Sequence, residues 1–341
     1  MVAAVKGGRI SIQPELEFTQ FTTRYDPATS AIWCWMSPAP LPCITSRLLD
    51  EVAQLQTQLT ATYNNQGPDT VWPFRHLVLA SKISGIYNLG GDLQLFKDCI
   101  QQQNEECLRA YAHKCVSLLH QNINNLDLPI TMIALIQGQA MGGGLETALS
   151  CDVIIAERSA QMGFPEILFN LFPGMGAYNL LARRIGASLA ERIILSGKTY
   201  SAAELYEMGV VDVLAEDGEG ELAVEKYLSS HNQSHNTIAS MKKIRQIVHP
   251  ISQKNLFEVV DIWVEAALAL SEKDLAKLDR LLHAQQTLKD RRDRAEINSG
   301  KIPRRGDWRK IEDVEFPLIT HLGENIFRNR RQTSRRKSKV E

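Results

Sequence analysis

The stretch that decides the fold is Ile130-Thr-Met-Ile-Ala-Leu-Ile-Gln-Gly-Gln-Ala-Met-Gly-Gly-Gly-Leu-Glu146. Its first seven residues are mostly apolar, which is typical of a strand buried inside a sheet. The glycines from 138 to 144 predict a tight turn, and we expect a helix from Gly142 to Leu149. A strand, a glycine turn and a helix in succession indicate an α/β architecture.

The same succession occurs earlier in the chain. An apolar strand is expected at 76–80, and the turn Tyr87-Asn-Leu-Gly-Gly-Asp92 follows it. Helical spacing of apolar residues predicts helices over 46–62 and 93–120. Further strands are expected at 31–36 and 153–156, and helical patterning dominates from residue 201 onward. The alternation predicts buried sheets covered by helices.

Composition favours a globular protein. The chain has 341 residues, 44% of them hydrophobic, and a net charge of -1. This size suits one large catalytic domain with appendages, or two domains. A near-zero charge excludes a general attraction to nucleic acid or to anionic membranes. Only the stretch at 328–341 is strongly basic, and we expect it to be a solvated tail.

Six cysteines occur, without a CxxC pair or zinc-ligand spacing: Cys34, Cys43, Cys99, Cys107, Cys115 and Cys151. We therefore expect reduced thiols, no metal site and no cofactor. Residues 1–15 lack the apolar centre of a secretory signal, and no apolar run reaches the roughly 20 residues of a membrane span. Both observations favour a cytoplasmic protein.

Two glycine turns after two buried strands suggest a site for a developing negative charge. Glycine allows close approach to the main chain, and free N–H groups at a helix start point outward. One amide from each turn would form an oxyanion hole. Alternatively, the glycines serve only turns and tight packing, which is the better interpretation of a glycine run taken alone. The spacing fits neither GxxxxGK[ST] nor GxGxxG phosphate loops.

Two glutamates accompany these turns. Glu146 falls in the first turn of a helix, where complementing the helix dipole is its simplest role. Glu166 lies in the apolar stretch 162–172, where burial would raise its pKa and suit it to proton transfer. A surface position or a helix cap is the alternative for Glu166. Together with both turns, the two glutamates indicate paired acid/base catalysis.

These motifs resemble the crotonase (enoyl-CoA hydratase) superfamily over residues 30–290. The resemblance rests on both glycine turns, on two glutamates twenty residues apart, and on the stretches 151–152, 164–176 and 201–212. It implies a spiral of ββα units with a C-terminal helical region. It also implies that Glu146 and Glu166 are the catalytic acids, and that the backbone N–H groups of Gly91 and Gly143 form the oxyanion hole.

A closer resemblance is to the diffusible signal factor synthases of bacterial quorum sensing, carried by residues 87–96, 166–178 and 262–273. It implies dehydration of a 3-hydroxyacyl chain on acyl carrier protein to a cis-2-enoyl thioester, then hydrolysis to a free fatty-acid signal. Asn170 departs from that family, in which an aspartate is expected. The implied substrate-binding residues are Leu89, Gly90, Met141, Gly142, Phe169, Phe172 and Met175.

The residue patterns and the resemblance together predict a domain plan. A catalytic core with N-terminal strands would span 1–200, and a helical region for pocket cover and oligomerisation 201–295. An extension with a basic, mobile tail, 296–341, lies beyond the part that resembles the family. Implied partners are the carrier protein, a regulatory signal receptor or sensor, and further subunits in a trimer or hexamer. Two other functions stay open: an enoyl-CoA hydratase of fatty-acid metabolism, and a non-catalytic acyl- or partner-binding protein.

Overall fold

Three successive strand pairs, each followed by helices, form the centre of the fold. The computed structural model describes residues 2–6, 9–13, 18–65, 72, 74–231 and 235–299. In each pair the first strand joins a six-stranded sheet and the second joins a four-stranded sheet. The pairs are β5 (His76–Ser81) with β6 (Ile86–Asn88), β7 (Thr131–Ile136) with β8 (Gln139–Met141), and β9 (Val153–Glu157) with β10 (Gln161–Gly163). This arrangement confirms the expected spiral of ββα units.

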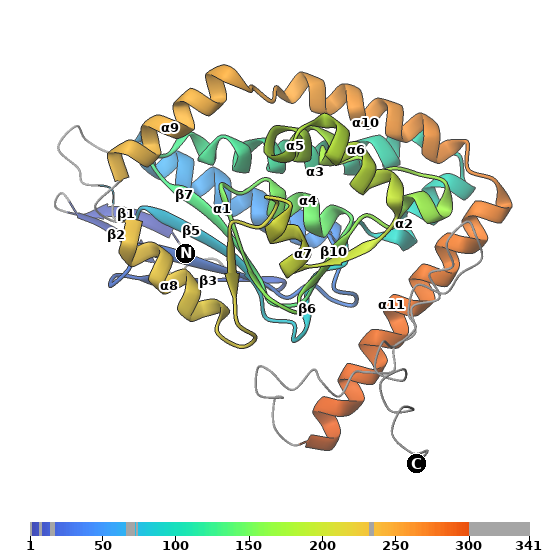
Figure 1. Cartoon of the computed structure of the whole chain (residues 1–341), viewed down its shortest axis with the longest axis horizontal. Helices are drawn as coiled ribbons and strands as arrows, with labels where there is room; N and C mark the ends of the chain where they lie inside the picture. Colours follow the sequence, from blue (N-terminus) through green and yellow to red (C-terminus); the bar gives the residue numbers. More distant parts are fainter. Residues whose placement is uncertain are drawn as a thin grey trace, which may run out of the picture.

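Helices complete each unit (Figure 1). The first is followed by α2 (Leu93–Gln101) and α3 (Glu105–Ile123), and the second by α4 (Gly143–Leu149). The third is followed by the short helix η2 (Glu166–Phe169) and by α5 (Ala177–Ile185) and α6 (Ala187–Ser196). The long helix α1 (Ser46–Asn64) precedes them and packs on α3.

The six-stranded sheet has the order β12-β9-β7-β5-β4-β3. Its strands pair in parallel except β3 (Phe21–Asp26), which runs antiparallel to β4 (Ala31–Met36). β12 (Val213–Ala215) follows α7 (Ala202–Glu207), and β11 (Thr199–Ser201) closes the four-stranded sheet. β1 (Val2–Lys6) and β2 (Arg9–Gln13) form a separate ribbon.

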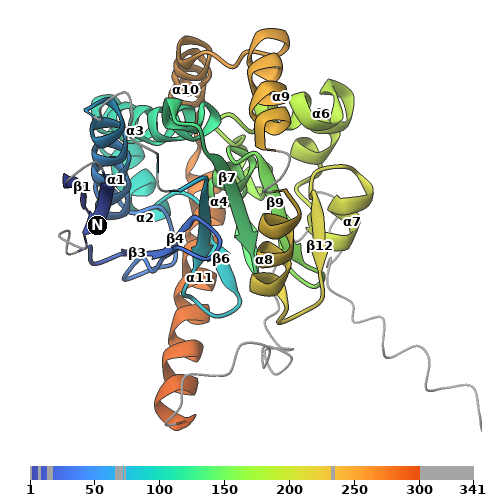
Figure 2. The same ribbon diagram turned by 90° about the vertical axis from the view of Figure 1, so that its left-hand side faces the viewer.

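Both faces of the six-stranded sheet are covered, which explains its apolar strands. In β4 the side chains of Ile32 and Cys34 join the larger hydrophobic core, whereas Trp33 and Trp35 join a smaller one. Alternate residues of a strand point to opposite faces, so the two cores lie on the two sides of the sheet. The smaller core is closed by α8 (Gly220–His231), which packs on β7, β9 and β12 and lies beside the sheet in Figure 2.

The C-terminal part is helical, as the sequence predicts. It comprises α9 (His235–Val248), α10 (Gln253–Leu268) and α11 (Glu272–Ser299). Helix α10 packs on α3, and α11 contacts α2 and η2 before it extends away from the body (Figures 1 and 2). The basic stretch at 328–341 lies outside the described residues, and the expected domain limits remain predictions.

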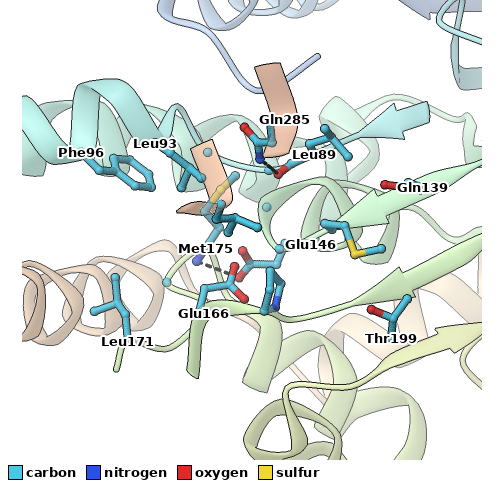
Figure 3. Close-up of a pocket in the computed structure, with 18 of the residues that line it drawn as sticks. Leu89, Leu93, Phe96, Gln139, Glu146, Glu166, Leu171, Met175, Thr199 and Gln285 are labelled. Atoms are coloured by element: carbon cyan, nitrogen blue, oxygen red, sulfur yellow. Dashed lines mark hydrogen bonds between the residues drawn. The ribbon is translucent and has the colours of Figure 1, made fainter. Parts of the chain in front are cut away.

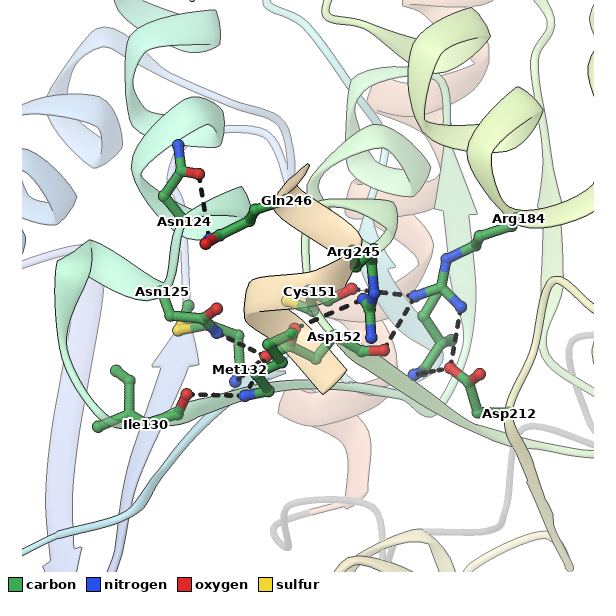
Figure 4. Close-up of polar contacts among 12 residues, drawn as sticks. Asn124, Asn125, Ile130, Met132, Cys151, Asp152, Arg184, Asp212, Arg245 and Gln246 are labelled. Carbon is green, nitrogen blue, oxygen red and sulfur yellow. Dashed lines mark hydrogen bonds and ion pairs between the residues drawn. The ribbon is translucent and has the colours of Figure 1, made fainter. Parts of the chain in front are cut away.

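A polar network holds α5 and α9 to the ends of the central strands (Figure 4). The Asp152 carboxylate accepts a hydrogen bond from Met132 N (3.0 Å) and forms an ion pair with Lys242 of α9 (2.7 Å). Arg184 of α5 forms an ion pair with Asp212 (3.0 Å). Asp152, one of the residues that carry the family resemblance, therefore stabilises the packing of α9 on the strands.

The remaining sequence expectations concern thiols, metals and membranes. All six cysteines are free, and every one except the partly exposed Cys107 is buried. The described part of the chain contains no cluster of three or more metal-ligating side chains. Within the same residues, no helix combines the length and apolarity needed to cross a bilayer.

Candidate active site

A cavity of about 260 Å³ lies where the ββα units meet the C-terminal helices (Figure 3). Its walls come from the glycine turns, α2, α3, η2, α10 and α11. Most of the lining is apolar. The apolar side chains that line it include Leu89, Leu93, Phe96, Met141, Phe169, Leu171, Met175, Trp263 and Leu281.

Glu146 is held rigidly in this cavity. It lies in the first turn of α4 and is only 1% exposed. Its Oε1 accepts hydrogen bonds from the backbone N–H groups of Met175 (2.8 Å) and Ala177 (2.9 Å). Two main-chain donors on one oxygen fix the direction of the carboxylate, because neither donor can rotate away.

Glu166 is held in a different way. It opens η2 directly after Pro165, and its Oε1 lies against Gly142, where an added Cβ would come within 2.2 Å. Its Oε2 is buried and has no hydrogen-bond partner among the described residues. Figure 3 shows the carboxyl groups of Glu146 and Glu166 facing each other across the cavity. The structure thus brings together the two glutamates that the sequence singles out.

Burial changes the proton affinity of both carboxyl groups. Desolvation, together with the charge of Glu166, raises the pKa of Glu146 to about 8, although the two backbone donors oppose the rise. Desolvation raises the pKa of Glu166 to about 7. Repulsion between the two charges acts on both, so the groups titrate as a pair. Near neutral pH the pair therefore holds about one proton, which supplies one acid and one base.

The two glycine turns lie against each other beside the glutamates. Within the described residues, the backbone N–H groups of Gly91 and Gly143 donate to no acceptor. The two are close, because a Cβ built on Gly143 would lie 3.4 Å from Gly91 N. The first turn is fixed by Gly90 N donating to Asn88 Oδ1 (2.8 Å) and by Ile44 N donating to Gly90 O (2.7 Å). Two free amides on a rigid frame are what an oxyanion hole requires.

Positive φ is needed at one residue of each turn. Gly90 has φ +94° and Gly142 has φ +49°, and side chains are disfavoured in this region. The structure also corrects the expected extent of the second turn. Strand β8 interrupts it, so the turn proper begins at Gly142 and the helix at Gly143.

The other predicted substrate-binding residues divide into two groups. Those that line the cavity are Leu89, Gly90, Met141, Gly142, Phe169 and Met175. Phe172, which the resemblance also implies as substrate-binding, is not among the described lining residues, and its partly buried ring packs against the hydrophobic core. Leu171 lines the cavity in its place. The chain reverses at Asn170, which adopts a left-handed conformation (φ +63°) and so changes which side chain faces inward.

The sequence predicts that the region 201–295 covers the pocket, but it does not single out any residue of α11. Gln285 lines the cavity and is 4% exposed. Its Nε2 donates to Leu89 O (3.4 Å), so its Oε1 is turned elsewhere and lacks a partner among the described residues. The apolar stripe at 256–288 indicated that these helices cover something, but a glutamine within that stretch gave no signal of its own.

Among the residues that the structure describes, the side chains that line the cavity include no lysine, arginine or histidine. The acidic groups that line it are the two glutamates, Tyr111 and Cys115. Burial raises the pKa of the Cys115 thiol to about 12 and that of Tyr111 well above its usual value. Both stay neutral at physiological pH, and the glutamates are the groups that exchange protons.

Known proteins share sequence and fold with this chain. The family model for enoyl-CoA hydratase/isomerase matches residues 52–274. Methylglutaconyl-CoA hydratase of Mus musculus is 36% identical over 156 residues, which cover 45% of this chain and 47% of that protein. The chain thus spans about half the length of the curated relatives it matches.

Solved structures share the fold. The enoyl-CoA hydratase of Bacillus halodurans superposes with a TM-score of 0.63 at 21% identity, over 76% of this chain and 99% of that one. DspI of Pseudomonas aeruginosa superposes with a TM-score of 0.54 at 24% identity, over 74% of this chain and 97% of that one. Because the family model covers well over half of the residues, this chain belongs to the enoyl-CoA hydratase/isomerase family.

Proposed function

We propose that this protein makes a cis-2-unsaturated fatty acid from a 3-hydroxyacyl thioester by dehydration followed by thioester hydrolysis. The observation that carries the proposal is the pair of facing carboxyl groups, Glu146 and Glu166, in an apolar cavity beside two free backbone amides. The sequence resemblance to diffusible signal factor synthases supports the choice of reaction. The carrier of the acyl chain would be acyl carrier protein.

Dehydration needs one base within reach of the C2 proton and one acid within reach of the 3-hydroxyl group. An ionised glutamate removes the C2 proton, and the thioester carbonyl oxygen takes up the negative charge. The amides of Gly91 and Gly143 stabilise that oxygen, and a donor of this kind contributes roughly 3–4 kcal/mol. The protonated glutamate then donates to the departing 3-hydroxyl group, which leaves as water.

Hydrolysis reuses the same groups. A glutamate removes a proton from water as the water attacks the thioester carbonyl, and the tetrahedral oxyanion occupies the same amide pair. Collapse expels the carrier thiol, which takes the proton. Glu166 suits this step because its Oε2 is buried without a partner and is free to bind a water molecule.

The lining favours an uncharged acyl chain. Methylglutaconyl groups carry a free carboxylate, and burying one without a cation costs several kcal/mol. Here the lining side chains of the described residues include two carboxyl groups and no cation, so a substrate carboxylate would be repelled. Although methylglutaconyl-CoA hydratase is the relative compared above, this observation favours a fatty acyl substrate over a carboxylated one.

The test is product analysis with purified full-length chain. The chain is incubated with 3-hydroxyacyl carrier protein, and free and carrier-bound acyl groups are separated and identified by mass spectrometry. We expect free cis-2-enoic acid, and its loss in the isosteric variants Glu146→Gln and Glu166→Gln. If only carrier-bound enoyl product forms, the hydrolytic half of the proposal is wrong.

Two other outcomes would select the alternatives. Fast hydration of trans-2-enoyl-CoA without free acid would identify an enoyl-CoA hydratase, for which the same glutamate pair is suited. Binding of acyl carrier protein with no turnover, unchanged in both glutamine variants, would identify a non-catalytic binding protein.

A further inference from the structure

Two cysteines meet at the corner where α2 turns into α3. Cys99 lies in the last turns of α2, and Cys107 lies in the first turn of α3. The Sγ atoms are 2.8 Å apart, well inside the distance at which two non-bonded sulfur atoms normally rest. The two side chains therefore already point at each other.

The corner itself is pinned by hydrogen bonds. Asn104 N donates to Cys99 O (2.8 Å), and Cys107 N donates to Asn104 Oδ1 (3.0 Å). These contacts hold the two helix ends together independently of the thiols. A disulfide needs an Sγ–Sγ distance near 2.05 Å, so closing it requires less than an ångström of further approach.

The pair is accessible from one side. Cys99 is buried (5% exposed), whereas Cys107 is partly exposed. Both line a surface hollow, together with Asp98 and Asn104. A small oxidant therefore reaches Cys107 first, with Cys99 directly behind it.

We infer that Cys99 and Cys107 form a reversible disulfide that clamps α2 to α3. Both helices supply cavity wall, through Leu93 and Phe96 on α2 and Tyr111 on α3. The disulfide would thus connect two parts of that wall at their shared corner. The remaining four cysteines, Cys34, Cys43, Cys115 and Cys151, are buried.

The oxidant is a low-molecular-mass disulfide such as oxidised glutathione. The Cys107 thiolate attacks one sulfur of the oxidant, one glutathione thiolate leaves, and a mixed disulfide forms at Cys107. Cys99 loses its proton to solvent and attacks the Cys107 sulfur, and the second glutathione thiolate leaves. Two protein thiols are oxidised and one oxidant disulfide is reduced to two thiols. Burial, with the adjoining Cys107 thiol, raises the pKa of Cys99 to about 12, so the second step is the slow one.

The experiment counts thiols in the full-length chain. Protein reduced with dithiothreitol and then treated with oxidised glutathione is alkylated under denaturing conditions and digested with trypsin. Cleavage after Lys97 and Arg109 gives one peptide, 98–109, that contains both cysteines. We expect this peptide to be two hydrogens lighter than its reduced form and unalkylated, with the other four cysteines alkylated. Dithiothreitol should restore the alkylated form.

Variants separate this disulfide from general oxidation. Cys99→Ser should leave a mixed glutathione disulfide at Cys107 and no internal link, whereas the control Cys34→Ala, which changes a buried thiol in β4, should keep the link. The oxidised protein should melt several degrees higher than the reduced one, because the link restricts the unfolded chain. The inference would be overturned if both cysteines of peptide 98–109 remained fully alkylated after oxidation. It would also be overturned if Cys99→Ser lost two alkylatable thiols on oxidation, as the wild type does.

Discussion

The surroundings of Glu146 and Glu166 differ although the two side chains are chemically the same. Glu146 sits on a buried helix and is oriented by two main-chain donors to one oxygen. Glu166 sits on a short helix, is confined by the backbone of Gly142, and has one oxygen without a partner. Directional bonds position one acid, whereas close packing positions the other.

This difference indicates how each acid should respond to change. A carboxylate fixed by backbone donors keeps its place when its charge is removed, because a neutral oxygen still accepts from the same N–H groups. A carboxylate fixed by packing is displaced when a larger residue replaces its neighbour. Substitutions at the two acids and at the residues around them distinguish positioning by hydrogen bonds from positioning by packing.

Loss of either charge should have the largest effect. Glu146→Gln and Glu166→Gln should each lower kcat by about 10³-fold, since general acid–base catalysis typically supplies 10²- to 10⁴-fold. Both variants should keep the melting behaviour of a folded protein, which circular dichroism checks. Steady-state assays on the thioester substrate measure the loss. A decrease below tenfold in both would remove the pair from the chemistry.

The packing around Glu166 gives the second prediction. In Gly142→Ala the new Cβ would lie 2.2 Å from Glu166 Oε1, so the carboxylate must move. We expect kcat/KM to fall by about 10²-fold, as a misplaced catalytic group costs about that much. The matched control is Gly218→Ala, which has a similar positive φ (+84°) but nothing within 4 Å of the added Cβ. Equal losses in both variants would mean that backbone strain, not contact with Glu166, is responsible.

Sequence reasoning succeeded where a pattern repeats over many residues. Apolar runs predicted the strands β4, β5, β7 and β9, and their alternation with helices predicted buried sheets covered by helices. The ββα spiral was implied by the family resemblance. The two glutamates were recognisable because each follows a turn or an apolar stretch with few other polar residues. Local chemistry of this kind survives in the sequence.

The sequence could not predict features that depend on one residue or on distant contacts. The strands β6, β8 and β10 have three residues each, too few for a periodicity to show. The reversal at Asn170 exchanged Phe172 for Leu171 in the cavity wall. Gln285 meets Leu89 across 196 positions of sequence, a contact that only the folded chain establishes.

The buried charges also affect stability, with a sign opposite to that of most acids. Burial raises the pKa of Glu146 from 4.5 to about 8, so the folded state binds a proton that the unfolded state has already lost. The stability that this proton gives is complete below pH 4.5 and is lost as the pH rises through about 8. Glu146→Gln lacks this loss. As the pH rises from 5 to 9, the unfolding free energy of the variant minus that of the wild type should therefore increase by on the order of 2 kcal/mol. Urea denaturation at each pH measures this difference.

A parallel pH dependence in wild type and variant would contradict this assignment. The test also bears on the comparison of the two acids. If Glu166→Gln shows the larger gain, the costly charge at high pH belongs mainly to the acid without backbone donors. Backbone donors lower the pKa of Glu146, so this outcome would still agree with a coupled pair of glutamates. It would also show that the backbone donors stabilise the charge on Glu146.

Substitution of Gln285 should lower kcat/KM by less than the changes above. Its side-chain oxygen Oε1 has no hydrogen-bond donor among the described residues and could accept one from the substrate. Gln285→Leu removes this acceptor and the hydrogen bond to Leu89 O beside the first glycine turn. We expect kcat/KM to fall about tenfold, the equivalent of one hydrogen bond to an uncharged group. Gln286→Leu changes the exposed neighbour on the same helix and should leave kcat/KM unchanged. Equal behaviour of the two variants would exclude Gln285 from substrate binding.

The smallest effect is expected at Asn170, the position where the resembling synthases are expected to carry aspartate. Asn170 adopts a left-handed conformation, which asparagine and aspartate both tolerate, so the backbone contributes little to a comparison of the two. Its Nδ2 lies 3.5 Å from Asp274 Oδ2, and Asp274 is also bonded to Ser271 and Lys277, which hold its pKa below the usual range. Asn170→Asp would therefore place two negative charges together and lower the unfolding free energy at pH 7 by about 1 kcal/mol.

The deficit should shrink as the pH falls toward 3, where the new carboxyl group becomes protonated. Asn170→Gly, which carries no charge and accepts the same φ, should show no such pH dependence. A pH-independent deficit in Asn170→Asp would mean that the amide hydrogen bond matters here and the charge does not.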